Sequence, residues 1–428
     1  MQKTFLKFVV YELIERIARA DYLLADCARM PDKVSPALIT ALQQQSTALK
    51  TQVLADQAFL SELFTDAPLP DNSLHHWLKD DFGVHYKTLS ALSTALNSLY
   101  KGALLPETNL FLKDAAPEEL SEAFGPIAIV TTPENHADPV AGVPVTGVLL
   151  SHLPLLQKNN PLGWTTLIQG LCKQLAKTSP ALEAVKPRLK KVLDHNEAVV
   201  ETMLMHALAL RLLGPAYYFS SLADAVFNRD AVFFNWVEPA LFIGLNHLGL
   251  TSKSLVILHE AAERSKPVFL KSWGAEDDGV VDKDAITALF NAVERAIPDK
   301  HAFTQKQFER ALLLQERLAQ GTLLSASPIY PVEEVSVYFE EMRATGEVAI
   351  YDALARMTET PHTAREVLNA GWVYKAERAP VWLYSTVAVQ GEDYDGFERL
   401  RELIEGTDIL LQKSIETSEL HKMLLCSV

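Results

Sequence analysis

Cysteine is scarce in this sequence, and long apolar runs are missing. The three cysteines, Cys27, Cys172 and Cys426, are far apart and odd in number, so they form neither a disulfide framework nor a CxxC metal motif. Near the amino terminus, an apolar run too short for a secretory signal is followed by Glu12 and Glu15. No stretch reaches the roughly 18 uncharged apolar residues of a membrane-spanning helix. We therefore expect a cytoplasmic protein without a signal peptide or a transmembrane segment.

Positive charge is also in short supply. The 428 residues include 39 Lys and Arg against 54 Asp and Glu, which gives a formal net charge of −15. An acidic surface repels phosphate groups, and this argues against nucleic-acid binding and against docking on anionic lipid. The chain is long enough for two or three ordinary domains, or for one large domain with a sizeable core.

Helical periodicity dominates what is present, and the two amino-terminal helices are amphipathic. Two β-rich runs, 127–131 and 143–150, are separated by a loop rich in Pro, Asn, Asp and Gly and predict two strands of a small sheet. We expect a mainly α fold of the α+β class. Its expected parts are an amino-terminal helical region (1–120), a core with the small sheet (121–270) and a carboxy-terminal helical region (271–428). Helices are predicted over 3–28, 35–66, 73–104, 161–177, 193–213, 215–228, 282–297, 303–320, 333–356, 363–370 and 394–425.

Several common catalytic and nucleotide-binding motifs are absent. The sequence contains no GxGxxG, GxxxxGK[ST], GxSxG or CxxC pattern. The segment HEAAERSK begins at His259 like a zinc-binding helix, but Glu263 stands where the second histidine of HExxH would be. We interpret it as the solvated start of a helix. The apolar run at 254–259 fits either a strand or a buried helix.

One predicted helix carries polar groups opposite its apolar stripe. In NNPLGWTTLIQGLCKQL, Asn160 suits the N-cap position and the following proline suits the first helical position. Trp164 begins the apolar stripe, while Gln169 and Lys173 lie four residues apart on the other face. Between them Gly170 is unfavourable, because glycine weakens the middle of a helix.

A second predicted helix, in the segment that ends LRLLGPAYYF, carries acids and a histidine. Glu197 and Glu201 form an i,i+4 pair on one face, and His206 lies on another face. Like charges at this spacing destabilise a bare helix slightly, but they are tolerated in water or around a cation. Taken alone, the pair fits a solvated acidic face. The helix is predicted to end at Gly214, and Pro215 starts the next one.

Together these segments resemble a group of bacterial and archaeal zincin-like metallopeptidase homologues. The resemblance runs from about residue 145 to the end, and it is carried by HLPLLQKNNPLGWTTLIQGL, LRLLGPAYYF, VLNAGWVYKAE and LLQKSIETSELH. In that group the first helix carries HExxH, whose histidines bind one Zn²⁺ while the glutamate activates a water molecule. The second, acidic helix supplies the remaining ligand. The resemblance implies a zincin-like core with two active-site helices.

When the motif is aligned on the tryptophan of NPLGW, the two histidines and the glutamate of HExxH are all replaced. Gln169 and Lys173 occupy the histidine positions, and Gly170 occupies the glutamate position. In the second helix Glu201 is at or beside the first acidic position, and His206 replaces the second. The resemblance therefore implies a former metal and catalytic site that holds neither catalytic residues nor a metal or other cofactor.

Three readings of this substituted site stay open. Lys173 would replace the lost metal charge and pair with Glu201 or Glu197, or it would simply extend into water. In the third reading a zinc site is retained through Glu201 and His206. The residues that would line a pocket there are His152, Trp164, His195 and Glu197.

We expect a catalytically inactive metallopeptidase-like protein that has a binding, regulatory or scaffolding role. Its partners would be other proteins or copies of itself, with no nucleic acid and no membrane. One alternative is a metal-independent hydrolase or lyase that uses Glu201 and His206. The other is a purely structural helical interaction protein.

Overall fold

The computed structural model describes most of the chain. The described residues are 2–29, 35–100, 103–122, 124–132, 144–145, 148–193, 196–277, 279–319, 362–388 and 396–426. The predicted helix over 333–356 and the candidate residue His195 lie outside them. None of the described helices is both long enough and apolar enough to cross a lipid bilayer.

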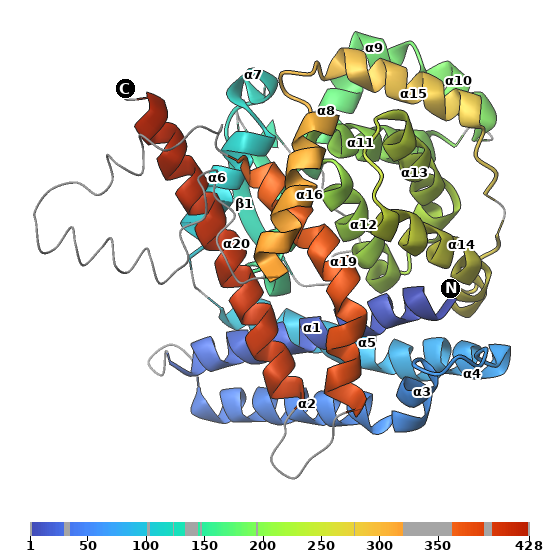
Figure 1. The fold of residues 1–428 in the computed structure, drawn as a ribbon, viewed down its shortest axis with the longest axis vertical. Helices are drawn as coiled ribbons and strands as arrows, with labels where there is room; N and C mark the ends of the chain where they lie inside the picture. The colour runs from blue at the N-terminus through green and yellow to red at the C-terminus, as the bar shows by residue number, and fades with distance from the viewer. Residues whose placement is uncertain are drawn as a thin grey trace, which may run out of the picture.

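Helices make up most of the described chain, as the periodicity predicts (Figure 1). The amino-terminal helices are α1 (Gln2–Ala28), α2 (Pro36–Ala55), α3 (Gln57–Glu62), α4 (Asp71–His76), the π-helix η1 (Trp77–Asp81), α5 (Phe82–Leu99), α6 (Pro106–Ala115) and α7 (Glu118–Ser121). The middle helices are the 3₁₀ helices η2 (Leu155–Gln157) and η3 (Pro161–Ile168), then α8 (Gln169–Thr178), α9 (Pro180–Glu183), α10 (Lys186–Val192), α11 (Glu197–Leu213), α12 (Pro215–Asn228), the π-helix η4 (Phe233–Val237), α13 (Glu238–His247) and α14 (Lys253–Trp273). The carboxy-terminal helices are α15 (Lys283–Ala296), α16 (Gln305–Ala319), α19 (Ala364–Ala388) and α20 (Gly396–Cys426).

A small mixed sheet completes the α+β class that the sequence predicts. Its strands are β1 (Ile127–Thr132), β2 (Pro144–Val145) and β3 (Val148–Pro154). The central strand β3 pairs in parallel with β1 and antiparallel with β2. The two predicted β-rich runs are therefore confirmed, and the second run contains two strands rather than one.

Most of the first helix is buried. In Figure 1, α1 lies between α2 and the crossing helices α19 and α20, and it also contacts α5, α12 and α14. Its polar side chains Glu12, Glu15, Arg16 and Arg19 are buried together with its apolar ones. Both the apolar and the polar face of this helix are therefore covered by other helices. Because α1 contacts α12 and α19, the three expected regions pack against one another, while their boundaries stay a prediction.

The junction between α11 and α12 is a sharp turn at a glycine. Gly214 has a φ of +66°, a conformation that L-residues with a side chain rarely adopt. A Cβ at this position would also lie 2.3 Å from the ring of Phe303. The predicted end of one helix at Gly214 and the start of the next at Pro215 are both confirmed.

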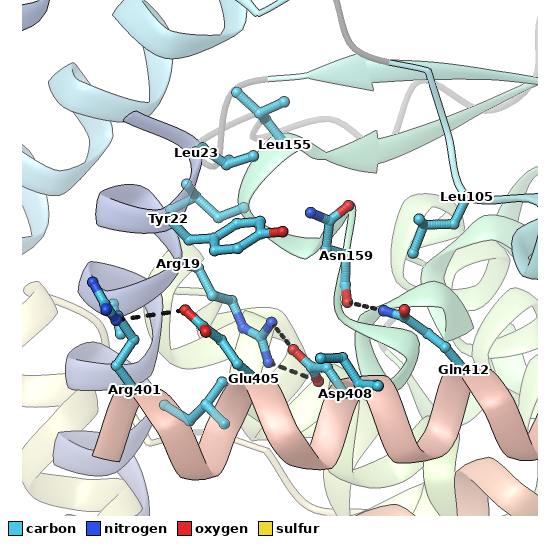
Figure 2. A pocket seen from close by; sticks show the side chains of 14 residues that line it. Arg19, Tyr22, Leu23, Leu105, Leu155, Asn159, Arg401, Glu405, Asp408 and Gln412 are labelled. Atoms are coloured by element: carbon cyan, nitrogen blue, oxygen red, sulfur yellow. Dashed lines mark hydrogen bonds and ion pairs between the residues drawn. The ribbon is translucent and has the colours of Figure 1, made fainter. Parts of the chain in front are cut away.

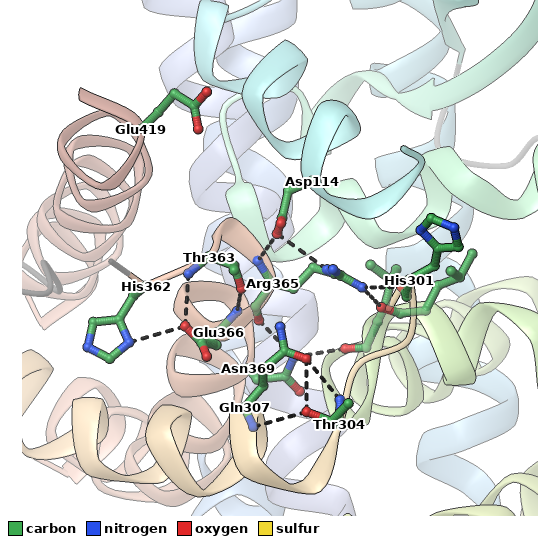
Figure 3. A network of polar contacts seen from close by, with 12 residues as sticks. Asp114, His301, Thr304, Gln307, His362, Thr363, Arg365, Glu366, Asn369 and Glu419 are labelled. Carbon is green, nitrogen blue, oxygen red and sulfur yellow. Dashed lines mark hydrogen bonds and ion pairs between the residues drawn. The ribbon is translucent and has the colours of Figure 1, made fainter. Parts of the chain in front are cut away.

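Polar side chains at the start of α19 fasten this junction (Figure 3). The Asn369 side chain accepts a hydrogen bond from the Ala216 amide at 2.8 Å and donates one to the Leu213 carbonyl at 2.8 Å. Arg365 Nη1 donates to the Leu212 carbonyl at 2.9 Å. These bonds satisfy backbone groups that a helix end leaves without partners. They also fix the direction in which α12 leaves the turn.

Candidate functional site

The helix predicted over 161–177 exists, but its first half has a different geometry. Asn160 caps it as expected, since its side chain accepts a hydrogen bond from the Leu162 amide at 3.1 Å. Pro161–Ile168 then forms a 3₁₀ helix, and the α-helix begins only at Gln169. Gly170 consequently lies in the first turn of α8, directly after the 3₁₀ helix. The 3₁₀ helix supplies partners at the start of α8, since the Gln169 amide donates to the Thr166 carbonyl, so Gly170 lies within one continuous helical stretch.

Trp164 belongs to the core. Its side chain is completely buried, its Nε1 donates to the Lys158 carbonyl at 3.2 Å, and its ring lies 6.3 Å from that of Phe111. A tryptophan with no exposed surface and a satisfied indole N–H fixes the position of η3.

The two helices of the substituted motif lie side by side, because α8 packs along α11. Gln169 Nε2 donates a hydrogen bond to the Tyr217 hydroxyl at 3.2 Å. The same hydroxyl lies 2.9 Å from His206 Nδ1. We call Gln169, Tyr217 and His206 the tyrosine chain. The structure thus brings two of the predicted site residues together through a third residue that the sequence analysis did not select.

Every member of the tyrosine chain is uncharged at neutral pH. Burial lowers the pKa of His206 to about 3, and burial raises the pKa of Tyr217. The Tyr217 hydroxyl accepts from Gln169 and shares a second hydrogen bond with Nδ1 of the neutral His206 ring, whose direction the ring tautomer sets. A histidine that binds protons only near pH 3 is a poor general base at neutral pH, where catalysis needs a pKa close to the working pH.

The charge pair considered for Lys173 is not formed. Lys173 and Glu201 are both half-buried, and among the described residues no ion pair joins them. Glu197 pairs instead with Lys190 at 2.7 Å, on the surface of the molecule. His152 lies half-buried in β3, where its register partner in β1 is Val130. The geometry therefore favours the reading in which Lys173 has no charge partner.

A second polar cluster surrounds the next residue along α12. The Tyr218 hydroxyl donates to Glu238 Oε1, and His259 Nδ1 lies 2.7 Å from the same oxygen. Glu238 is only 1% exposed, and the ring of Phe242 stacks on His259 with centroids 3.5 Å apart. Burial, and then the charge of Glu238, raise the pKa of Glu263. We call Tyr218, Glu238, His259 and Glu263 the carboxylate cluster.

This cluster corrects the interpretation of HEAAERSK as a solvated helix start. Helix α14 begins at Lys253, with Ser252 as its N-cap, so His259 lies well inside it. The i,i+4 spacing of His259 and Glu263 places both on the face that meets α13. The spacing of His259 and Glu263 indicates in the sequence that they share a helix face. Their buried partner Glu238 cannot be identified from the sequence.

A third polar group crosses the centre of the molecule. Lys375 Nζ lies 2.6 Å from Glu12 Oε1 and 2.8 Å from Glu15 Oε2. Arg19 Nη2 lies 2.7 Å from Glu15 Oε1, and the same guanidinium pairs with Asp408. All five side chains are buried. We call Glu12, Glu15, Arg19, Lys375 and Asp408 the ion network.

The carboxylates of the ion network respond differently to their surroundings. Burial alone would raise the pKa of Glu15, but Lys375 and Arg19 lower it to about 2. Burial raises the pKa of Asp408 to about 6, although Arg19 opposes the shift. Burial likewise raises the pKa of Glu12, against the effect of Lys375. The network therefore contains three buried carboxylates and two buried cations.

Zinc does not fit the substituted helix pair. A zinc site needs three or four nitrogen, sulfur or carboxylate ligands around one point. Within the described part of the chain, no group of three or more His, Cys, Asp or Glu is arranged to hold a metal ion. At the helix pair itself, Gln169 offers an amide and Lys173 an ammonium, and an ammonium cannot bind a metal ion.

Comparison with known proteins adds no relative. No protein-family model matches the chain, and no match is found among curated proteins or among solved structures.

Proposed function

We propose that this protein is a catalytically inactive relative of zincin-like metallopeptidases that acts as a binding or regulatory scaffold, with a protein or a second copy of itself as the partner. The observation that supports the proposal is the tyrosine chain. It joins Gln169 on α8 to His206 on α11, two of the positions that the motif register assigns to metal ligands, through Tyr217 on α12. There the polar groups of Gln169, Tyr217 and His206 satisfy one another without a metal.

The metal-independent hydrolase that would use Glu201 and His206 gains no support from this geometry. His206 is 7% exposed, uncharged and hydrogen-bonded to Tyr217. A general base must reach a substrate proton and have a pKa near the working pH.

Zinc analysis tests the proposal directly. We expect the purified protein to retain no stoichiometric zinc after dialysis and to cleave no peptide in a broad substrate screen. Stoichiometric zinc that survives dialysis would contradict the inactive assignment.

A restored histidine pair tests the zincin-like origin of the helix pair. Gln169→His with Lys173→His places two imidazoles at i,i+4, and His206 or Glu201 is then available as a further ligand. Gln174→His with Thr178→His is the matched control, because it creates the same pair elsewhere on α8. We expect zinc to bind the first variant at least about tenfold more tightly, a difference of about 1.4 kcal/mol. Equal affinities would favour the purely structural helical protein.

A further inference from the structure

A groove of about 290 Å³ lies where three helices meet, and we call it the three-helix groove. Its walls come from the first turns of α1, from the first turns of α14 and from the middle of α19, and these helices contact one another. Figure 1 shows the amino-terminal end of α1 beside α14. The buried side chains of Phe8, Leu258 and Ala379 form an apolar floor, and the exposed Ile257 extends it toward solvent. A ligand can therefore reach an apolar surface here.

Two opposite charges lie on the walls of the three-helix groove without pairing with each other. Lys253 on α14 is exposed, and among the described residues its ammonium has no ion pair or hydrogen bond. Glu377 on α19 is also exposed. Its carboxylate accepts a hydrogen bond from Gln315 Nε2 but pairs with no cation in the described part of the chain. An ammonium has three donors and a carboxylate has two oxygens, so both groups can still bind a ligand.

The charges of the cleft between α1 and α20 are already paired, as Figure 2 shows. There Arg19 pairs with Asp408, and Arg401 lies 3.5 Å from Glu405. A charged ligand in that cleft would compete with existing ion pairs. In the three-helix groove each charge of a ligand would instead meet an opposite charge that has no ion-pair partner.

A proline adds a second acceptor to the α19 wall of the three-helix groove. Pro380 lies inside α19, and it has no N–H to donate to the carbonyl of Ala376 four residues earlier. Ala376 and Pro380 both line the groove, so this carbonyl lies on the wall that also carries the Glu377 carboxylate. The α19 wall thus presents acceptors for an ammonium group, and the α14 wall presents the Lys253 ammonium for a carboxylate.

The volume of the three-helix groove fits a molecule of amino-acid size. Pockets for drug-sized ligands start at about 300 Å³, whereas an apolar cavity of about 150 Å³ in another protein holds a benzene molecule. The groove, at about 290 Å³, is close to the first value. It accommodates one short apolar side chain together with two charged groups.

We propose that the three-helix groove binds a small zwitterion, of the class of α-amino acids with an apolar side chain. The ammonium group of the ligand donates to Glu377 and to the Ala376 carbonyl, its carboxylate pairs with Lys253, and its side chain lies on the apolar floor. The groove is separate from the helix pair of the proposed function, so each proposal stands or fails by its own measurement.

Leucine and two analogues that each lack one charge test the proposal. 3-Methylbutylamine is leucine without the carboxylate, and 4-methylpentanoate is leucine without the ammonium group. Titration calorimetry or ligand-observed NMR on the full chain measures the three affinities. We expect leucine to bind, and each analogue to bind at least about fivefold more weakly, because each loses a hydrogen bond between charged groups.

One substitution on each wall assigns the two charges. Lys253→Met should remove the preference for leucine over 3-methylbutylamine, and Glu377→Gln should remove the preference for leucine over 4-methylpentanoate. Lys87→Met and Glu260→Gln are the matched controls, because both residues are exposed and neither lines the groove. Both controls should preserve both preferences.

Ala376→Phe locates the binding, because the larger side chain fills the three-helix groove. It should abolish the binding of leucine while the circular dichroism spectrum stays that of the unmodified protein. Three results would each overturn the proposal: no binding of leucine up to its solubility limit, an analogue that binds as tightly as leucine, or a preference that survives the substitution on the matching wall. If Ala376→Phe unfolds the chain, the Lys253→Met and Glu377→Gln comparisons still decide.

Discussion

The tyrosine chain and the ion network both bury polar side chains between helices, and they differ in charge. The tyrosine chain holds an amide, a phenol and a neutral imidazole between α8, α11 and α12. The ion network holds three carboxylates and two cations between α1, α19 and α20. Tyr217 and His206 meet through one hydrogen bond, whereas Lys375 contacts two carboxylates at once.

The difference determines what each group tolerates. Removing one partner of a neutral buried hydrogen bond leaves the other unsatisfied at a cost of roughly 1–3 kcal/mol, so a loss in the tyrosine chain is bounded. In the ion network the removal of one cation leaves carboxylates buried without compensation, which is far more costly than the pair itself is worth. The ion network is therefore the more vulnerable of the two, although it contains more interactions.

Replacement of Lys375 should have the largest effect. Lys375→Met leaves Glu12 and Glu15 facing each other in the core, and we expect the free energy of unfolding to fall by about 3–5 kcal/mol. Urea denaturation followed by circular dichroism measures it. Lys173→Met is the matched control, because Lys173 is half-buried and has no ion pair with Glu201; it should change the free energy by less than about 0.5 kcal/mol.

A second substitution separates charge from packing at this position. Glu12→Gln added to Lys375→Met removes one of the stranded charges and should restore part of the lost stability. If the double variant is no more stable than Lys375→Met alone, uncompensated charge is not the cause. Equal losses of unfolding free energy for Lys375→Met and Lys173→Met would show that the ion network is no more important for stability than a half-buried lysine without an ion pair.

The pH dependence of stability should identify the tyrosine chain. The pKa of His206 is about 3 in the folded protein and near 6.5 when unfolded, so the unfolded chain binds the extra proton. This contribution to stability is complete above about pH 6.5 and is lost as the pH falls toward 3. Between about pH 7.5 and about pH 5 the loss is about 2 kcal/mol.

The variant His206→Asn isolates this effect from other titrating groups. Asparagine offers a polar atom to Tyr217 but does not titrate, so the stability of the unmodified protein relative to the variant should fall by about 2 kcal/mol over that pH range. Asp408 acts in the opposite sense: its folded pKa of about 6 lies above its unfolded value, so its stabilisation is lost as the pH rises. It contributes equally to both proteins and cancels in the difference. A constant difference across the range would show that His206 is not buried as a neutral imidazole.

Local patterns predicted the helices more successfully than the contacts between them. The turn at Gly214, the cap at Asn160 and the two β-rich runs follow from local backbone chemistry, and all are confirmed. The ion network joins residues 12–19 to residues 375 and 408. From the sequence, its glutamates and its arginine are expected to be solvated. They are buried only because α19 and α20 pack against α1. No local periodicity carries that information.

At the candidate site, too, the sequence predicts local features but not the contacts between helices. Gln169 and His206 were selected from a motif register, and they do lie in one hydrogen-bonded chain. The sequence alone assigns no role to Tyr217, because the direction of its side chain depends on how Gly214 and Asn369 orient α12. Tyr218, one residue later, reaches the carboxylate cluster instead. Adjacent helical residues point about 100° apart, so two neighbouring tyrosines serve two different sites.

The smallest expected effect concerns a charge pair between Lys173 and Glu201. If Lys173 compensated Glu201 across the helix pair, Lys173→Met and Glu201→Gln would be coupled by 0.5–3 kcal/mol, as is usual for residues in one charge network. The structure forms no such ion pair, so we expect a coupling energy below about 0.3 kcal/mol in a double-mutant cycle. Lys375→Met with Glu12→Gln serves as the positive control for the cycle. A coupling at Lys173 as large as at Lys375 would mean that the helix pair keeps a charge bridge in solution.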